Sequence, residues 1–358
     1  MTLSRRNFVG GALASSALAL QSKNLFAAPS YGSVDTVILG GKFHTMDPRF
    51  SGVEALAIRG ERIVAVGSLA DIKNLSQKHT VVIDARGMTI VPGFIDAHSH
   101  PLMANEAVSV DVGFRTIPEV QAALAKKAAT TPKGHWVQGH MYDDTKFEEG
   151  RPVLKSDLDA VSKEHPIFIR HRGGHTGVVN SMAYQVAGIK SDSPDPKGGM
   201  IYRDGTGFTG RIAENALDLF TTKGIWPEVD RRANQENVKL ITQKMASAGL
   251  TSTTDAYGGL AEWQAFQDSY HAGEMSCRVS FMPGALSVFD PDAPPAYELF
   301  KNMGLKTGFG DNMLRVGAVK LAVDGSASER TMRMSTPYKG RPDDFGILTM
   351  DQDSLDAA

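Results

Sequence analysis

Two histidines separated by one residue, His98 and His100, follow a short apolar segment. Residues two apart on a β-strand point to the same face, so at the carboxyl end of a strand both imidazoles can approach one ion. Neutral imidazole is a common ligand of zinc and similar divalent metals. An isolated His-x-His pair more often has a structural or surface role. Here the apolar strand, the preceding Pro92-Gly93 and the following Pro101 favour a metal site.

Asp96 precedes this pair with the same strand parity. It could hold one of the imidazoles in place by a hydrogen bond, as the partners of metal-binding histidines usually do. It could equally cap the end of the strand. Both interpretations remain open from the sequence.

The composition limits the kinds of metal site and of partner. With 42% hydrophobic and 22% charged residues among 358, the chain is typical of a globular protein. Lys and Arg number 38 against 40 Asp and Glu, and this net charge of -2 predicts no nucleic-acid binding and no binding to an anionic membrane. Cys277 is the single cysteine, which excludes a site built from several thiolates. A metal would therefore be held by histidine, carboxylate or a modified lysine.

The first 28 residues have the layout of an export signal. Arg5 and Arg6 precede an apolar run over residues 11–20, and the small residues Ala27 and Ala28 follow it. This layout resembles a twin-arginine signal peptide, and the alternative is a basic start followed by a short core helix. The apolar run is too short to span a membrane. We expect a periplasmic or secreted mature chain, exported by the twin-arginine machinery and not embedded in a membrane.

Short strand patterns separated by glycine turns predict a small β-module over residues 29–91. From residue 92 onward, helical and strand patterns alternate at long intervals, which is typical of an α/β protein with a parallel sheet. The expected helices are 118–129, 234–248 and 262–272, and the expected strands include 166–170, 250–255, 277–282 and 314–323. Residues 191–210, rich in Gly, Pro and Asp, are predicted to form a solvated loop.

Four separated motifs occur in order along the chain. They are residues 91–100 (VPGFIDAHSH), residues 175–181 (HTGVVNS), residues 198–201 with Thr209-Gly210, and residues 319–326 (VKLAVDGS). The first resembles the entry strand of the amidohydrolase superfamily of metal-dependent hydrolases. The other three are similar to the branch of that superfamily that contains N-substituted formamide deformylases. The resemblance extends from about Val34 to the end of the chain.

The resemblance implies an α/β fold, the N-terminal part of a (β/α)8 TIM-like barrel with a small β-sandwich module, and a metal at the carboxyl ends of the barrel strands. It implies that His98 and His100 bind the metal and that Lys320, often carbamylated in this family, bridges two ions. The cofactor is then a divalent metal, expected to be zinc, as one or two ions. A carbamate would turn the cationic Lys320 into an anionic oxygen ligand. The alternative for Lys320 is an unmodified lysine in a salt bridge.

Three residues are expected to bind substrate. His175 and Asn180 resemble positions that the family places near the substrate, where they would polarise a carbonyl. The alternative is that residues 171–175 form a hydrogen-bonded loop without a catalytic part. Asp324 is expected to bind substrate or to shape the floor of the metal pocket.

The number of expected strands falls short of a complete barrel. The motifs indicate about four of eight barrel strands, in a partial barrel over residues 92–358 with an insertion around 105–230. The family's later ligand histidines, and the aspartate that accepts a proton from the attacking water, have no counterpart here. We therefore expect the chain to be truncated at its C-terminus, as the N-terminal part of a longer enzyme.

Two hypotheses of function follow. The first is a metal-dependent amidohydrolase that cleaves a non-peptide carbon–nitrogen bond of a small-molecule amide, formamide or cyclic amide by means of a metal-activated water. The second is a truncated, catalytically inactive fragment that works, if at all, only with a complementary C-terminal half. A homo-oligomer is compatible with either hypothesis.

Overall fold

The computed structural model describes residues 33–103, 105, 108–284 and 295–357. The predicted signal peptide, residues 1–28, lies outside the described residues. The chain divides into two units between Pro92 and Gly93, and each unit is described by itself. In the described part of the chain, no helix has both the length and the apolar character needed to cross a membrane.

The smaller unit is built on a four-stranded sheet with the order β4-β3-β1-β5. Its elements are β1 (Thr36–Leu39), β2 (Lys42–Phe43), η1 (Pro48–Phe50), β3 (Ala55–Arg59), β4 (Arg62–Gly67), α1 (Leu69–Lys73), β5 (Val81–Asp84) and β6 (Thr89–Ile90). Strands β2 and β6 form a separate pair. Val37, Ala55 and Ala57 make the centre of its core together with Ile72 of α1. These strands lie within residues 29–91, where the β-module was predicted, and the described residues do not show a two-layer sandwich.

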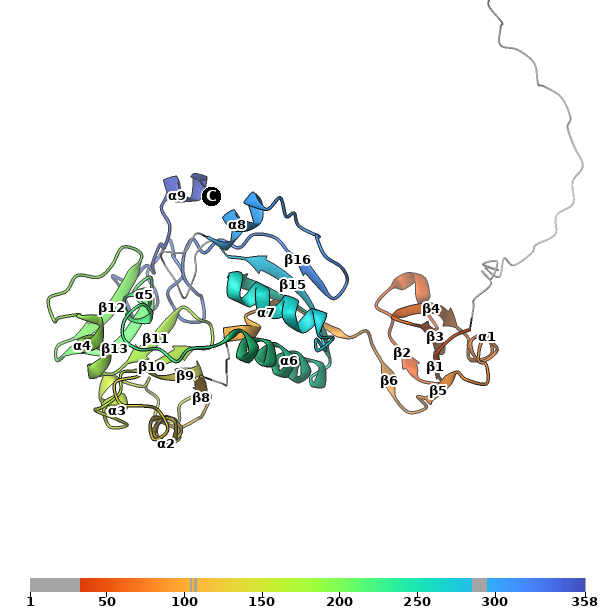
Figure 1. The fold of residues 1–358 in the computed structure, drawn as a ribbon, viewed down its shortest axis with the longest axis horizontal. Helices are drawn as coiled ribbons and strands as arrows, with labels where there is room; N and C mark the ends of the chain where they lie inside the picture. Colours follow the sequence, from red (N-terminus) through yellow and green to blue (C-terminus); the bar gives the residue numbers. More distant parts are fainter. Residues whose placement is uncertain (1–32, 104, 106–107, 285–294, 358) are drawn as a thin grey trace, which may run out of the picture. The chain divides into compact units, whose positions relative to one another are not determined.

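The larger unit contains a sheet of four parallel strands in the order β16-β15-β14-β7. The strands are β7 (Phe94–Ser99), β14 (Leu250–Gly258), β15 (Arg278–Pro283) and β16 (Leu314–Val316). The helices α6 (Arg231–Ser247), α7 (Leu260–His271) and α8 (Ala296–Asn302) alternate with them along the chain. Helices α6 and α7 lie side by side next to this sheet (Figure 1). Trp263, Phe266, Phe281 and Phe300 fill the space between helices and strands.

The four expected barrel strands are thus present, neighbours in chain order and parallel, whereas a closed barrel is not seen among the described residues. The fourth strand is also shorter than predicted. It ends at Val316, and Lys320 makes only one isolated bridge, to Gly284. The chain beyond Gly317 therefore leaves the sheet and passes over the ends of its strands.

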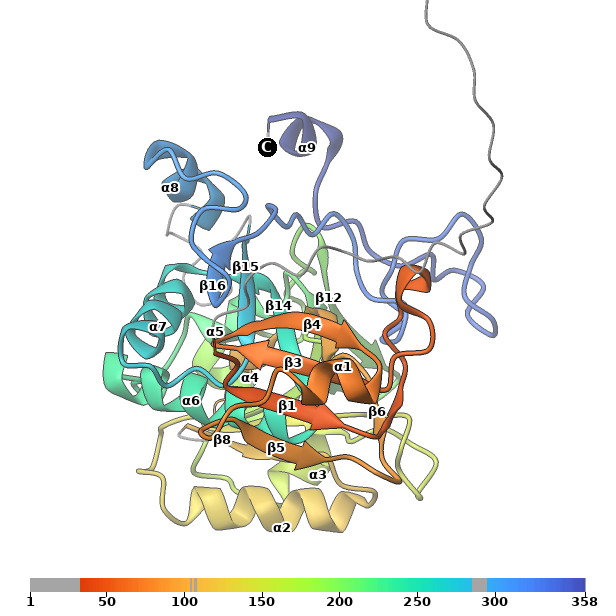
Figure 2. The ribbon, with the colours of Figure 1, turned by 90° about the vertical axis from the view of Figure 1, so that its right-hand side faces the viewer.

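A second sheet of six strands occupies the region of the predicted insertion, with the order β12-β13-β11-β10-β9-β8. Its strands are β8 (Ser109–Asp111), β9 (Val137–Tyr142), β10 (Ile167–His171), β11 (Thr176–Val179), β12 (Gly199–Asp204) and β13 (Gly207–Glu214). The helices of this region are α2 (Ile117–Ala128), α3 (Lys155–Asp159), α4 (Ser181–Ala187) and α5 (Asp218–Thr221). Helix α2 contacts β8 and β9, and Figure 2 shows it next to α3. The remaining elements are η2 (Pro101–Met103) and α9 (Gln352–Ala357).

The loop predicted over residues 191–210 is wrong for its second half. Residues 199–214 form the antiparallel hairpin β12–β13. Its turn contains Asp204, which accepts a hydrogen bond from the backbone N–H of Thr206, and Gly207 with a φ of 115°. The Gly and Asp content marked this tight turn, while the apolar residues on either side of it pair as strands.

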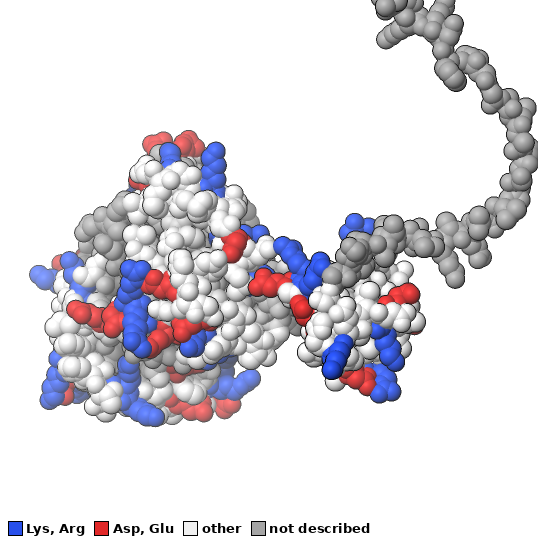
Figure 3. All heavy atoms as spheres, turned by 45° about the vertical axis from the view of Figure 1, so that its right-hand side comes forward, with Lys and Arg blue, Asp and Glu red and all other residues white. Residues whose placement is uncertain are grey.

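Charged side chains of both signs are mixed on the surface. Arg231 and Lys239 of α6 pair with Asp268 of α7 and with Glu274, which follows α7, at 2.7 and 3.0 Å. Figure 3 shows the same mixture of signs on the face that it draws. Such exposed pairs contribute little to stability, because water and salt screen them. The expectation that the chain does not bind nucleic acid stays a prediction.

Candidate functional site

The carboxyl end of β7 brings His98 and His100 to one side of the parallel sheet. Their ring centroids are 5.5 Å apart, with an interplanar angle of 77°. Ser99, between them, faces the neighbouring strand, where its hydroxyl bonds the Oγ1 of Thr253 at 2.6 Å and the carbonyl of Thr254 at 3.1 Å. The alternation of a strand thus places the two imidazoles together, as expected from their spacing.

Lys320 reaches the same place from the segment that follows β16. Its backbone N–H donates to the carbonyl of Pro283 at the end of β15, at 3.1 Å. His98, His100 and Lys320 line one cavity of about 720 Å³ together with His175 and Asp324. The tertiary structure therefore brings Lys320 to the other two predicted metal ligands, although it lies 220 positions after His100 in the sequence.

The electrostatics of this cluster keep both imidazoles uncharged. Burial lowers the pKa of His100 to about 4, and the positive charge of Lys320 adds to the effect. Burial and Lys320 also lower the pKa of His98. Burial lowers the pKa of Lys320 itself. The histidines therefore present free nitrogen lone pairs, which is the form that binds a divalent metal.

Two aspartates flank these residues in the sequence: Asp96 precedes His98, and Asp324 follows Lys320. The Oδ1 of Asp96 accepts the backbone N–H of His98 at 3.1 Å, and no hydrogen bond from Asp96 to an imidazole is found among the described residues. Asp324 lines the cavity, and its Oδ2 accepts the backbone N–H of Arg333 at 3.0 Å. This bond is compatible with the capping interpretation of Asp96, and its role beside a bound metal stays a prediction.

His175 directly precedes β11 and lines the same cavity as Lys320. Its Nδ1 is 2.9 Å from Oε2 of Glu214, and its backbone N–H donates to Oε1 of Glu329 at 3.3 Å. Burial lowers the pKa of His175, but the hydrogen bond and charge of Glu214 and the charge of Glu329 outweigh it, so the pKa is raised. Sequence reasoning missed both glutamates, because neither belongs to a recognisable motif.

Asn180 is fully buried and does not reach the cavity. Its Oδ1 accepts the backbone N–H groups of Ile167 and Ala183, each at 3.0 Å, and its Nδ2 donates to the carbonyl of His165 at 2.9 Å. It is the N-cap of α4 and ties that helix to β10. Its amide is fully used inside the protein, so we do not keep Asn180 in the proposed substrate site.

We expect Asn180→Ala to destabilise the fold without a specific effect on substrate binding. The substitution removes a helix cap and leaves buried backbone groups unpaired, which costs about 2 kcal/mol. The free energy of unfolding, measured by urea denaturation, should fall by this amount, while Asn302→Ala on the exposed end of α8 should leave it unchanged. An unchanged stability combined with a raised KM would restore the substrate-binding role.

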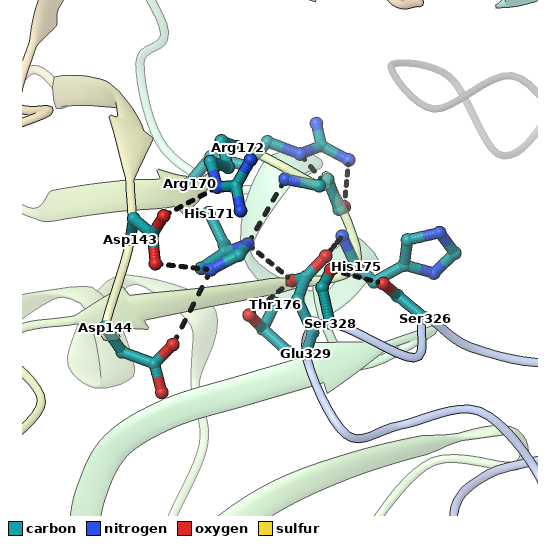
Figure 4. Close-up of polar contacts among 12 residues, drawn as sticks. Asp143, Asp144, Arg170, His171, Arg172, His175, Thr176, Ser326, Ser328 and Glu329 are labelled. Carbon is teal, nitrogen blue, oxygen red and sulfur yellow. Dashed lines mark hydrogen bonds and ion pairs between the residues drawn. The ribbon is translucent and has the colours of Figure 1, made fainter. Parts of the chain in front are cut away.

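A second group of ionisable side chains lies beside the cavity, at the ends of β9 and β10 (Figure 4). The Nε2 of His171 is 3.6 Å from Oδ1 of Asp144 and 4.0 Å from Oδ1 of Asp143, and its Nδ1 is 3.3 Å from Oε2 of Glu329. The His171 side chain is 2% exposed. Burial lowers the pKa of His171, but its interactions with the carboxylates of Asp144 and Glu329 outweigh burial and raise the pKa to about 9. A pKa in this range favours the charged form of His171 at neutral pH.

Asp143, Asp144 and His171 have the spacing of a candidate metal site, because one ligand atom from each lies within 4.8 Å of the others. Three cations already pair with the two carboxylates: Arg172 with Asp143 at 2.7 Å, Lys146 with Asp143 at 3.4 Å, and Arg330 with Asp144. With Glu329 included, three carboxylates face these three cations and His171. A divalent ion would add positive charge to a cluster that is already compensated, so we assign the group to a structural ion network.

A smaller cavity, of about 160 Å³, adjoins the first and shares His100, His175 and Lys320 with it. Its other walls include Asp255 at the end of β14 and Glu262 at the start of α7. Burial, together with the charge of Glu262, raises the pKa of Asp255 to about 7. This cavity offers a buried volume next to the histidines, large enough for part of a small molecule.

Comparisons with known proteins agree with this geometry. The profile of the amidohydrolase family matches residues 81–358. An N-substituted formamide deformylase of Arthrobacter pascens is 30% identical over 298 residues, which are 81% of this chain and 54% of that protein. The protein LONG AFTER FAR-RED 3 of Arabidopsis thaliana is 27% identical over 332 residues, 90% of this chain and 55% of that protein. The chain thus spans about half the length of these two relatives.

A solved structure is also similar. The crystal structure of an uncharacterized metal-dependent hydrolase from Pyrococcus horikoshii superposes with a TM-score of 0.62 at 22% identity, covering 89% of this chain and 61% of that one. At this level of identity the similarity supports the fold alone.

Proposed function

The chain belongs to the amidohydrolase family, and from this premise we propose that it hydrolyses a carbon–nitrogen bond other than a peptide bond. The observation that carries the proposal is the meeting of His98, His100 and Lys320 in one cavity, with His175 and Asp324 on its walls. The substrate would be a small-molecule amide, formamide or cyclic amide. The similarity to a formamide deformylase favours N-substituted formamides among these.

The residues of the cavity suit a divalent metal, for which we propose zinc, as one or two ions. His98 and His100 offer neutral imidazoles, and the lowered pKa of Lys320 favours the uncharged amine that a carbamate requires. His98, His100 and a carbamylated Lys320 would hold the metal, which would supply a Lewis acid for the carbonyl and lower the pKa of water to about 7. Imidazole and anionic oxygen are both accepted by zinc.

The other residues of the site would bind and orient the substrate. His175 and Arg170 bring hydrogen-bond donors to the walls of both cavities. The smaller cavity would exclude water from one end of the substrate, with Leu102, Met103 and Tyr257 as its less polar lining. Hydrolysis of a C–N bond needs only water as a second substrate, so the site requires no further bound reactant.

The experiment that tests the proposal is a substrate screen with the purified chain loaded with zinc. The panel contains N-alkyl and N-aryl formamides, acetamides and cyclic imides, and the readout is release of free amine or ring opening. We expect turnover of at least one class, and none by a His98→Ala, His100→Ala double variant. Zinc-loaded chain that turns over no member of the panel would instead favour the non-catalytic hypothesis.

We also propose a periplasmic or secreted location, reached through the twin-arginine pathway. The support is the Arg5-Arg6 motif and the apolar run that follows it. Fusion of residues 1–30 to a reporter that requires this pathway would test the location, with Arg5→Lys and Arg6→Lys as the blocking substitutions.

A further inference from the structure

The strongest polar contact of His175 is with Glu214, a residue that the amidohydrolase motifs do not include. The two residues are joined twice. The backbone N–H of Glu214 donates to the carbonyl of His175 at 2.8 Å, and the Nδ1 of His175 lies 2.9 Å from Oε2 of Glu214. The register of β11 and β13, in which Thr176 faces Ala213, places the pair directly side by side.

Glu214 is built into this position at a conformational cost. Its φ is +53°, in the left-handed region that a residue other than glycine, asparagine or aspartate seldom adopts. Its side chain is 5% exposed, and within the described residues its Oε1 has no hydrogen-bond partner. Buried carboxylates on residues with strained backbone geometry are concentrated at sites where the charge has a function.

Gly325 makes room for this carboxylate. A Cβ at position 325 would lie 2.5 Å from Oε1 of Glu214, so a side chain there would displace it. Gly325 belongs to the Asp324-Gly325-Ser326 motif that lines the large cavity. The close approach gives this glycine a physical role, which is to let the segment after β16 pass over the Glu214 side chain.

The opposite edge of the His175 ring faces the site. His175 lines both cavities with His100 and Lys320, and its side chain remains 31% exposed although Nδ1 is occupied by buried Glu214. Oε1 of Glu329 accepts the backbone N–H of His175, and this bond fixes the position of the backbone from which the ring extends (Figure 4). With Nδ1 bound to Glu214, Nε2 is the nitrogen that remains for a substrate.

We propose that Glu214 is a positioning residue that holds His175 as the proton donor to the leaving nitrogen of the substrate. The proposal rests on the proposed function, hydrolysis of a C–N bond. When that bond breaks, its electron pair goes to nitrogen, which takes the proton of His175 Nε2 and leaves as a free amine. The attacking water gives its hydroxyl to the carbonyl carbon, and its remaining proton returns the imidazole to the charged form. The products are one carboxylic acid and one amine.

The charges around His175 agree with this role. Burial and the cation Arg170 lower its pKa, and the groups His98, His100 and Lys320 share the cavity that it faces. Glu214 and Glu329 act in the opposite direction and outweigh them, so the pKa of His175 is raised. A carboxylate that stabilises an imidazolium is the arrangement that a general acid needs.

The test compares leaving groups of different basicity in substrates with the same acyl group. For an alkylamine leaving group, which needs protonation, Glu214→Gln should lower kcat by about 10- to 100-fold with little change in KM, and His175→Asn by about 100-fold or more. For a nitroaniline leaving group, which departs without a proton, both losses should shrink to a few-fold. Glu236→Gln, which removes an exposed carboxylate of α6, is the matched control and should not change either rate.

A second readout does not depend on activity. Nitrogen-15 NMR of histidine-labelled protein, with the His175 signals assigned from their absence in His175→Asn, reports which ring nitrogen carries the proton. In the unaltered chain Nδ1 of His175 should be protonated. In Glu214→Gln the protonation of the ring should shift to lower pH, with thermal melting used to show that the variant is folded.

The outcomes separate the two proposals. Equal losses for both leaving groups in His175→Asn, or unchanged NMR signals in Glu214→Gln, would overturn the proton-donor role and leave amide hydrolysis intact. Absence of turnover by the unaltered chain with every leaving group would overturn the proposed function and the donor role that rests on it. A leaving-group dependence that steepens in both variants, with shifted His175 signals in Glu214→Gln, would establish the pair.

Discussion

Replacement of His98 and His100 together by alanine is expected to reduce bound zinc from near one equivalent to almost none. The double variant removes both imidazoles of the proposed ligand set and leaves Lys320 as its single remaining member. We expect amide hydrolysis to fall by at least about 1,000-fold, because the carbonyl and the attacking water lose their activating cation. Elemental analysis of dialysed protein measures the first effect, and amine release measures the second.

The matched control is a His44→Ala, His79→Ala double variant. Both of these histidines are exposed in the smaller unit, so their loss should leave zinc content and activity unchanged. Retention of one zinc equivalent by the His98, His100 variant would contradict the assignment and would move the metal elsewhere. The spacing of Asp143, Asp144 and His171 would then be the first alternative, which Asp144→Asn would test.

Substitution of His171 by alanine is expected to destabilise the protein by about 3–5 kcal/mol, which is typical when one partner of a buried ion network is removed. The carboxylates of Asp143, Asp144 and Glu329 would keep their burial and lose the cation between them. The edge contact of His171 with Tyr142, at 5.8 Å between ring centroids, would be lost as well. Urea denaturation at pH 6.5 measures the change in the free energy of unfolding.

The pH dependence gives this prediction a distinct signature. The pKa of His171 is raised to about 9 in the folded protein, above the 6.5 of an unfolded chain. Its charge therefore contributes fully to stability below about pH 6.5, and the contribution is lost as the pH rises through about 9. The difference between the unaltered protein and His171→Ala should shrink by on the order of 2 kcal/mol between these pH values. A difference that stays constant over this range would show that His171 is neutral in the folded protein.

The ion network and the proposed site share one residue. Glu329 contacts His171 with Oε2 and bonds the backbone N–H of His175 with Oε1. Thr176 donates its hydroxyl to the same carboxylate at 2.6 Å. Glu329 thereby joins the segment after β16 to the start of β11. Stabilisation of the fold and placement of His175 are for this reason carried by the same side chain.

Local patterns predicted the parts of the site that depend on a single strand. The alternation of a strand is sufficient to set His98 and His100 on one face, and the apolar runs located the parallel strands β7, β14 and β15. Lys320 was predicted by its motif alone, because its distance from the histidines along the chain carries no spacing signal. The strand expected around it ends early, at Val316, since the segment that carries Lys320 passes over the ends of the strands.

For side chains that can act in two ways, the neighbouring sequence does not determine the role. The amide of Asn180 can bind a substrate or cap a helix, and its burial beneath α4 selects the cap. The carboxylate of Asp96 can hold an imidazole or the backbone, and it holds the backbone of His98. In both cases the same hydrogen-bonding groups are available to either partner, and packing determines which partner is within reach.

The sequence by itself determined the chemistry that this protein can use: paired imidazoles at a strand end, no thiolate cluster, and a lysine within an amidohydrolase motif. Only the tertiary structure determined which charged side chains come into contact. Glu214 and Glu329 lie 39 and 154 positions from His175, and they reach it through the register of β11 with β13 and the return of the chain over the sheet. Strand and helix preferences act over a few neighbouring residues, whereas contacts of this kind depend on the packing of the whole unit.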